Sequence, residues 1–249
     1  MAEAPHSFPH LKNCEVVRPV LAPLINPCNT FGDPKGIKQV VLVGDSHAGM
    51  WGAGINAVAK QNHWKLAIYG KTGCPVANYP DWVDGTLKRV YTECNSWRSA
   101  VIKQIALLHP ALVIIGTEAR PAGVNEPNGM ADSVTALQKS GAKVALLADV
   151  PNPGRTDLVP DCLAAHQSDI QACAVPLTKA FIPGRTAEMD SARRAGATVV
   201  DPTPWFCTSI TCPVVISNVI VFADGSHITG TYGAFLAPEL NRAFADLVN

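Results

Sequence analysis

The sequence has no excess of charge of either sign, since 20 basic and 20 acidic side chains balance over its 249 residues. A domain that binds nucleic acid or an anionic membrane surface usually carries a basic excess, so neither kind of partner is expected. Long hydrophobic runs are also absent: the longest apolar stretches have the length of a strand, whereas about 20 residues are needed to span a bilayer. Residues 1–30 contain no apolar stretch typical of a signal peptide. The sequence therefore predicts a globular domain with neither an anchor nor an export signal of its own.

Cysteine, in contrast, is plentiful. The eight cysteines lie outside the predicted strands, and their even number is typical of loops held by disulfides. Pairing of sequence neighbours is the simplest arrangement, and it would join Cys14–Cys28, Cys74–Cys94, Cys162–Cys173 and Cys207–Cys212. Zinc is the alternative, but no two cysteines have the two-residue spacing of a structural zinc site. A reduced cytosolic protein with inert thiols is less favoured. We therefore expect an oxidising compartment, no metal, and a domain that is part of a longer exported or membrane protein.

Strand and helix patterns alternate along the chain after an irregular, proline-rich lead-in segment, residues 1–36. Apolar runs without alternation predict strands buried on both faces of a parallel sheet, at 38–43, 65–69, 111–115, 143–148 and 197–200. Helical spacing of apolar residues predicts helices at 47–61, 95–108, 130–140, 186–195 and 231–247. This order indicates one α/β domain, residues 37–249, in which helices cover both faces of a five-stranded parallel sheet.

The stretch VVLVGDSHAGMW, residues 40–51, places Ser46 between the first strand and the first helix. In an open α/β sheet, ligands bind at this edge, beyond the carboxyl ends of the strands. Ser46 could simply cap the helix. To act as a nucleophile, it needs a histidine base and a carboxylate that orients the base.

Of the seven histidines, His227 is the best candidate for this base. His47 adjoins the serine, but consecutive residues at the start of a helix point in different directions. Asp224 lies three residues before His227, so a tight turn can hold its carboxylate against one nitrogen of the imidazole. An ordinary Asp-Gly-Ser turn is the alternative, and the serine after the first strand favours the catalytic interpretation.

The two blocks Gly44-Asp45-Ser46 and Asp224-Gly225-Ser226-His227 resemble those of the SGNH (GDSL-like) hydrolase superfamily. The resemblance implies a flavodoxin-like three-layer α/β/α sandwich and an enzyme that uses no cofactor. It also implies that Ser46 is the nucleophile, His227 the general base and Asp224 its orienting carboxylate. Asp45 would have a structural role and hold the serine turn.

A closer resemblance rests on four further segments: residues 71–75 (KTGCP), 94–98 (CNSWR), 201–207 (DPTPWFC) and the C-terminal block. With these the chain is similar to the extracytoplasmic SGNH domain that is fused to bacterial acyltransferase-3 membrane proteins, which O-acylate cell-envelope glycans. The resemblance implies a domain on the periplasmic or cell-wall side, tethered to the membrane through the rest of the protein. Its partners would be an acyl donor and a glycan acceptor, and the isolated domain is expected to be a monomer.

The oxyanion hole departs from the superfamily pattern. Backbone N–H groups of Ser46 and Gly73 are the expected donors, and Gly70 is the alternative to Gly73. The third block normally reads Gly-x-Asn-Asp, but residues 116–120 of this chain read GTEAR. The asparagine donor is therefore missing, and Thr117 and Arg120 are the candidates to replace it in contact with substrate.

Three functions are compatible with these residues. The favoured one is a serine O-acyltransferase that works through an acyl-enzyme and passes the acyl group to a glycan hydroxyl. A carbohydrate or lipid esterase would use the same residues with water as the acceptor. A non-catalytic glycan-binding domain is the third, suggested by the missing asparagine and by aromatic residues in loops, namely Trp82, Tyr91, Trp97 and Trp205.

Overall fold

A single sheet forms the centre of the computed structural model, which describes the chain except for residues 1–14, 17–27, 121–127, 154–157 and 249. Of residues 15–16 and 28–30 only the backbone is described. The sheet has the strand order β1 (Glu15–Val16), β4 (Trp64–Lys71), β3 (Lys38–Gly44), β7 (Leu112–Gly116), β8 (Lys143–Leu147) and β10 (Thr198–Val200). All neighbours along this path are parallel. The five strands predicted from the sequence (β3, β4, β7, β8 and β10) thus follow the order second, first, third, fourth, fifth, which is the flavodoxin-like order.

These five strands confirm the predicted α/β fold, and their ends differ from the predicted ends by one or two residues at most. The segment predicted to be an irregular lead-in contributes two more strands. Here β1 pairs in parallel with the end of β4, and β2 (Cys28–Gly32) pairs antiparallel with its beginning. Both pair with the edge of β4 that β3 leaves open, and an open edge accepts short strands with little demand on their own sequence. The sheet therefore has seven strands instead of five.

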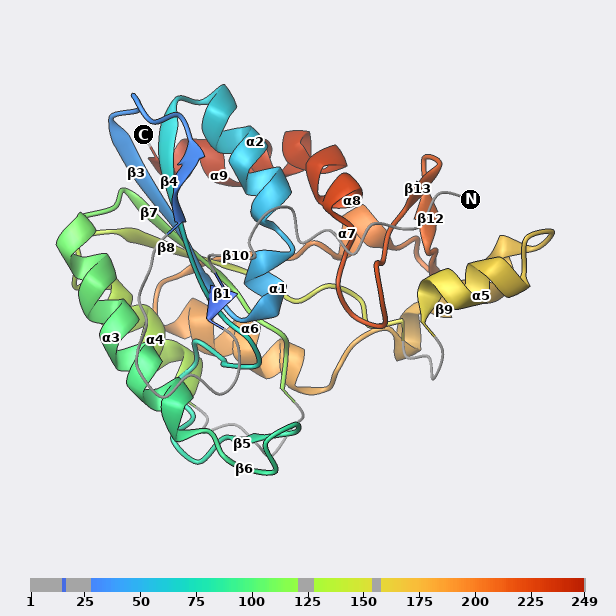
Figure 1. Ribbon diagram of the computed structural model, residues 1–249, viewed down its shortest axis with the longest axis horizontal. Helices are drawn as coiled ribbons and strands as arrows, with labels where there is room; N and C mark the ends of the chain where they lie inside the picture. Colours follow the sequence, from blue (N-terminus) through green and yellow to red (C-terminus); the bar gives the residue numbers. More distant parts are fainter. Residues whose placement is uncertain (1–14, 17–27, 121–127, 154–157, 249) are drawn as a thin grey trace.

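Helices cover both faces of the sheet (Figure 1). On one face lie α2 (Gly52–Gln61), α8 (Gly230–Phe235) and α9 (Ala237–Val248), and on the other lie α3 (Thr92–Leu108), α4 (Gly129–Gln138) and α6 (Gly184–Arg194). Strand β3 explains why the apolar run shows no alternation. Val40 and Leu42 pack in the first layer, Val41 and Val43 pack in the second, and all four are fully buried.

Two of the predicted helices are interrupted. The segment predicted at 47–61 forms a short α1 (Ser46–Gly49) followed by α2, and the segment predicted at 231–247 forms α8 and α9. Pro238 is the second residue of α9, and a proline lacks the N–H that a continuous helix would need at this position. The break between α8 and α9 therefore follows from the sequence. None of the described helices is long and apolar enough to cross a membrane.

The long connections carry short elements and the disulfides. The elements are β5 (Val83–Asp84), β6 (Arg89–Val90), α5 (Val159–Ala165), η2 (Ile170–Cys173), β9 (Val175–Pro176), η3 (Leu177–Lys179), α7 (Thr203–Phe206), β11 (Thr211–Cys212), β12 (Val215–Ile216) and β13 (Val219–Ile220). Three predicted disulfides are confirmed, namely Cys74–Cys94, Cys162–Cys173 and Cys207–Cys212. The fourth, Cys14–Cys28, involves side chains outside the described residues and stays a prediction. The six paired cysteines are not available as zinc ligands.

Candidate active site

The site lies where the order of the strands reverses, since β3, the first long strand, has the second and the third on either side. Such a switch point opens a crevice at the carboxyl edge of an α/β sheet. Gly44 at the end of β3 is level with Gly70 of β4 and with Gly116 of β7. Strands β3 and β7 end at their glycines and β4 ends one residue after Gly70, so the chain leaves all three strands at one edge of the sheet, and Ser46 lies there.

Small residues at this edge let α1 sit directly on the ends of the strands. A Cβ atom on Gly44 would lie 1.7 Å from the carbonyl oxygen of Gly116, and one on Gly116 would lie 2.8 Å from Cα of Ala48. No side chain fits in either place. The glycines thus fix the height of Ser46 above the sheet.

The structure brings Ser46, His227 and Asp224 together, although Ser46 and His227 are 181 residues apart in the chain. Nε2 of His227 is 2.9 Å from Oγ of Ser46, and Nδ1 of His227 is 2.8 Å from Oδ2 of Asp224. The other carboxylate oxygen of Asp224 accepts the backbone N–H groups of Ser226 and His227, both at 2.8 Å. The three residues predicted to form a triad are therefore linked by hydrogen bonds in the order that a serine triad requires.

Asp224 is ionised and solvent reaches the site. Burial by itself raises the pKa of Asp224, but the hydrogen bond and charge of His227 and the two backbone N–H groups hold this pKa well below its usual range. The side chains of His227 and Asp224 are 20% and 33% exposed. A small acceptor in solution, water included, can therefore reach the imidazole.

Asp45 connects the serine turn to the segment after β7. Its carboxylate is 1% exposed and accepts hydrogen bonds from the backbone N–H groups of His47 and Glu118. It also accepts the Thr117 hydroxyl at 3.0 Å and Nη2 of Arg120 at 2.8 Å. These contacts place Asp45 beneath the turn that carries Ser46, where it holds two strand ends together.

Thr117 and Arg120, the predicted substrate contacts, lie against Asp45. The Thr117 hydroxyl donates its single proton to Asp45, so this group has none left for an oxyanion. Arg120 also donates to the carboxylate of Glu118 at 2.6 Å and lies over the ring of Trp82. Among the described residues, neither side chain hydrogen-bonds to Ser46 or His227. Both are buried, so they support the turn from below.

Gly73 lies in a turn that leaves its N–H group available. It is the third residue of a tight turn in which Cys74 N–H donates to the Lys71 carbonyl at 3.0 Å, and its φ of +65° is one that favours glycine. No acceptor within the described part of the chain takes its N–H. Gly70, the alternative, lies inside β4 with β3 on one side and β1 on the other. The geometry thus favours Gly73 over Gly70, together with the N–H of Ser46 in the first turn of α1.

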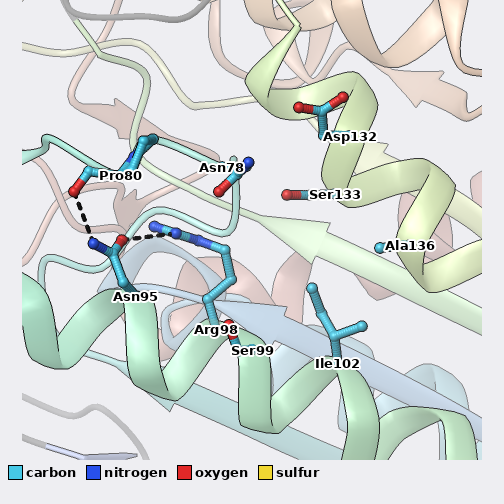
Figure 2. Close-up of a pocket in the computed structure, with 9 residues that line it drawn as sticks. All are labelled: Asn78, Pro80, Asn95, Arg98, Ser99, Ile102, Asp132, Ser133 and Ala136. Carbon is cyan, nitrogen blue, oxygen red and sulfur yellow. Dashed lines mark hydrogen bonds between the residues drawn. The ribbon is translucent and has the colours of Figure 1, made fainter.

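The loop that carries Gly73 is anchored to α3. The Cys74–Cys94 disulfide joins the two, and Nε of Arg98 donates to the Pro75 carbonyl at 3.1 Å. Asn95 links Arg98 to the Pro80 carbonyl through two hydrogen bonds (Figure 2). A cavity of about 250 Å³ lies beside these groups between α3 and α4, and no residue of the Ser46–His227–Asp224 set lines it. The anchors hold the turn at Gly73 in place.

A second histidine and carboxylate pair, which the sequence did not reveal, lies at the same edge. Nδ1 of His47 is 2.7 Å from Oδ1 of Asp149, and the ring of His47 meets the ring of His227 edge-on, with 4.8 Å between the centroids. The His47 ring is directed to Asp149 and, within the described residues, makes no hydrogen bond with Ser46. That direction leads to the end of β8, where Asp149 follows the strand by two residues. The strand-edge rule applied to the fourth predicted strand could have found Asp149.

A family model described as "SGNH domain (fused to AT3 domains)" matches residues 13–242. The chain belongs to this SGNH family. Among solved structures, the SGNH fold of the chain is similar to the periplasmic domain of a lipopolysaccharide acetyltransferase from Salmonella ser. Paratyphi A. The TM-score is 0.64 at 15% identity, over 84% of either chain.

Two hydrolases show weaker structural similarity to this SGNH domain. One is a carbohydrate esterase family 2 enzyme with a carbohydrate-binding domain from Corynascus thermopiles (Myceliophthora fergusii), with a TM-score of 0.47 and 16% identity over 87% of this chain and 68% of that one. The other is a GDSL-like lipase from Bacteroides thetaiotaomicron VPI-5482, with a TM-score of 0.43 and 18% identity over 85% and 87%. No curated protein sequence matches the chain.

Proposed function

We propose that this SGNH domain is a serine-dependent O-acyltransferase that passes an acyl group to a hydroxyl of a cell-envelope glycan. The observation that carries the proposal is the chain of hydrogen bonds from Ser46 through His227 to Asp224. Membership of a family whose domains are fused to AT3 domains favours an acyl donor supplied by a membrane part of the same protein. The disulfides favour a location outside the cytoplasm.

In the first half-reaction, Oγ of Ser46 attacks the carbonyl carbon of the acyl donor while Nε2 of His227 takes the hydroxyl proton. The oxyanion that forms accepts the N–H groups of Ser46 and Gly73. The donor's leaving group then departs with the proton from His227, and the acyl group remains on Ser46 as an ester. Asp224 stays ionised throughout and stabilises the imidazolium of His227.

In the second half-reaction, a glycan hydroxyl gives its proton to His227 and attacks the acyl-Ser46 carbonyl. Collapse of this intermediate returns the proton to Oγ of Ser46 and releases the acylated glycan. Water in the position of the sugar gives an esterase, and the exposure of His227 and Asp224 favours some hydrolysis as a side reaction. The triad geometry speaks against a domain that only binds glycans.

The test is acyl transfer from an activated ester to an envelope oligosaccharide, followed by mass spectrometry of the sugar. We expect an acylated oligosaccharide with the wild-type domain and with Ser168→Ala, a control at an exposed serine. Ser46→Ala should give none. Efficient ester hydrolysis without any acylated sugar would reduce the proposal to an esterase, and unchanged transfer by Ser46→Ala would refute it.

A further inference from the structure

Two histidine–aspartate pairs lie side by side at the carboxyl edge of the sheet. The proposed mechanism uses His227 and Asp224. The other pair, His47 and Asp149, is more buried, with side chains that are 3% and 5% exposed. Its members come from the start of α1 and from the segment after β8, and a hydrogen bond of 2.7 Å joins them. The two proposed half-reactions give this second pair no role.

Asp149 is held in place by the backbone. One carboxylate oxygen accepts the N–H of Ala119 and the other accepts the N–H of Val150, both at 2.9 Å, in addition to the ring of His47. Within the described residues, the bond to Asp149 is the only hydrogen bond of the His47 ring. The orientation of that ring is therefore set by a carboxylate that is itself rigid.

The surroundings of His47 carry an excess of negative charge. Its ring interacts with the carboxylates of Asp149 beyond β8, Asp45 after β3 and Glu118 beyond β7. The ring of His227, which is paired with Asp224, packs edge-on against it. Arg120 is engaged by Asp45 and Glu118. Burial alone lowers the pKa of His47, but the charge and hydrogen bond of Asp149, with further contributions from Asp45 and Glu118, raise it to about 9. A pKa raised above neutral pH favours the imidazolium form of the ring.

The positive charge of His47 lies in a site that lacks the asparagine donor of the superfamily's oxyanion hole. Glu118 stands where the superfamily pattern has its asparagine donor. Its backbone N–H is taken by Asp45 and its carboxylate by Arg120, so it offers no donor to an oxyanion. An oxyanion that forms at Ser46 would add to the negative charge of these neighbouring carboxylates. A positive charge on His47, whose ring centroid is 4.8 Å from that of His227, offsets this repulsion. The electrostatic effect is strong because His47 is buried.

We propose that His47 is a positioning residue for His227: Asp149 holds the His47 ring, and this ring fixes the plane of the His227 imidazole and keeps a positive charge beside the reacting atoms. The proposal rests on the function proposed above for Ser46 and His227. His47 itself exchanges no proton with the substrate.

The test compares His47→Asn with the wild-type domain in ester turnover as a function of pH. Asparagine places an amide N–H where Nδ1 stood, so Asp149 keeps a donor while the ring and the charge are lost. At neutral pH we expect kcat/KM to fall by at least about tenfold, less than the roughly 100- to 1,000-fold for loss of a direct oxyanion donor. The ratio of wild-type to variant kcat/KM should shrink as the pH rises through about 9, because the wild-type ring then loses its own charge.

Two further variants separate the possible causes. The matched control is His63→Asn, because His63 and Asp33 form a pair of the same kind at 2.8 Å on the surface, and its kcat/KM should equal the wild-type value at every pH. The double variant His47→Phe/Asp149→Asn keeps an aromatic ring against His227 without either charge. Its kcat/KM should fall as well. Its ratio to the His47→Asn value should not change near pH 9, because neither variant has a ring that titrates there.

A wild-type to His47→Asn ratio of kcat/KM below about twofold at neutral pH would overturn the proposal. A large ratio that does not change with pH would overturn it too, because a purely structural role predicts that result. Ser46→Ala, measured alongside, distinguishes this from failure of the proposed function. If Ser46→Ala still turns over ester, the triad assignment fails. If it is inactive while His47→Asn shows no pH-dependent ratio, only the role of His47 fails.

Discussion

Raising the pH from about 6 to about 10 should remove the proton of His47 while Asp149 stays ionised, and this should lower the stability of the folded protein. The pKa of His47 rises from 6.5 to about 9 on folding. Below its unfolded value of about 6.5 the pair therefore makes its full contribution, and this contribution is lost as the pH rises through about 9.

The magnitude follows from the size of this change. Each unit by which a pKa differs between the folded and unfolded states corresponds to about 1.4 kcal/mol, so the titration of His47 is worth about 3 kcal/mol of unfolding free energy. On the acid side the pair is lost only when Asp149 is protonated. Burial by itself raises the pKa of Asp149, but the charge and hydrogen bond of His47 and two backbone N–H groups hold it below its usual range. The contribution therefore has a plateau from about pH 4 to about 6.5.

Urea denaturation of wild type and His47→Asn across this range is the assay. Other groups titrate too; burial raises the pKa of Glu188 to about 8, for example, and this lowers stability as the pH rises towards 8. Both proteins share such contributions, so the difference between their unfolding free energies isolates His47. This difference should narrow by about 3 kcal/mol between about pH 6 and pH 10. A difference that is constant with pH would refute the assignment of a charge to the buried ring.

Three further predictions concern the triad, the strand ends and the loop of Gly73. Asp224→Asn should lower kcat/KM for ester hydrolysis by about 1,000-fold or more in a protein that remains folded, because an amide cannot stabilise the imidazolium; a loss below tenfold would contradict this. Gly44→Ala should lower the unfolding free energy by about 3 kcal/mol or more, since its Cβ meets backbone 1.7 Å away, whereas Gly85→Ala, with nothing within 4 Å, should change it by less than about 0.5 kcal/mol. Replacing both Cys74 and Cys94 by alanine should cost about 3 kcal/mol in chemical denaturation, from the entropy of a 20-residue loop, and lower kcat as well. Unchanged kcat would show that the disulfide does not position the oxyanion loop.

The sequence was most informative where one segment carries a complete signal. The run of four valine and leucine residues before Gly44 predicts a strand buried on both faces, and the structure confirms it. Asp224 and His227 lie on one turn, so their contact needs no knowledge of the fold. Their distant partner, Ser46, was singled out because it follows a predicted strand, at the edge of the sheet where ligands bind.

The rest depends on contacts that no local pattern encodes. Strands β1 and β2 form because β4 has an open edge, which the proline-rich lead-in does not reveal. His47 and Asp149 are 102 residues apart, and although Asp149 follows a predicted strand, nothing in the sequence pairs it with His47. The direction of the Thr117 and Arg120 side chains, towards Asp45, is set by the packing beneath the serine turn. Contacts between residues far apart in the sequence, and the directions of side chains, are known only once the fold is known.

The most direct test of the proposed mechanism is to locate the residue that reacts with a fluorophosphonate ester probe, by mass spectrometry of peptides from the labelled protein. We predict one labelled serine, Ser46, and loss of labelling in Ser46→Ala. In His227→Ala the rate of labelling should fall by at least about 1,000-fold because the base is gone. Label on another residue, or labelling of Ser46 at the same rate without His227, would contradict the central claim that Ser46 is a nucleophile activated by His227.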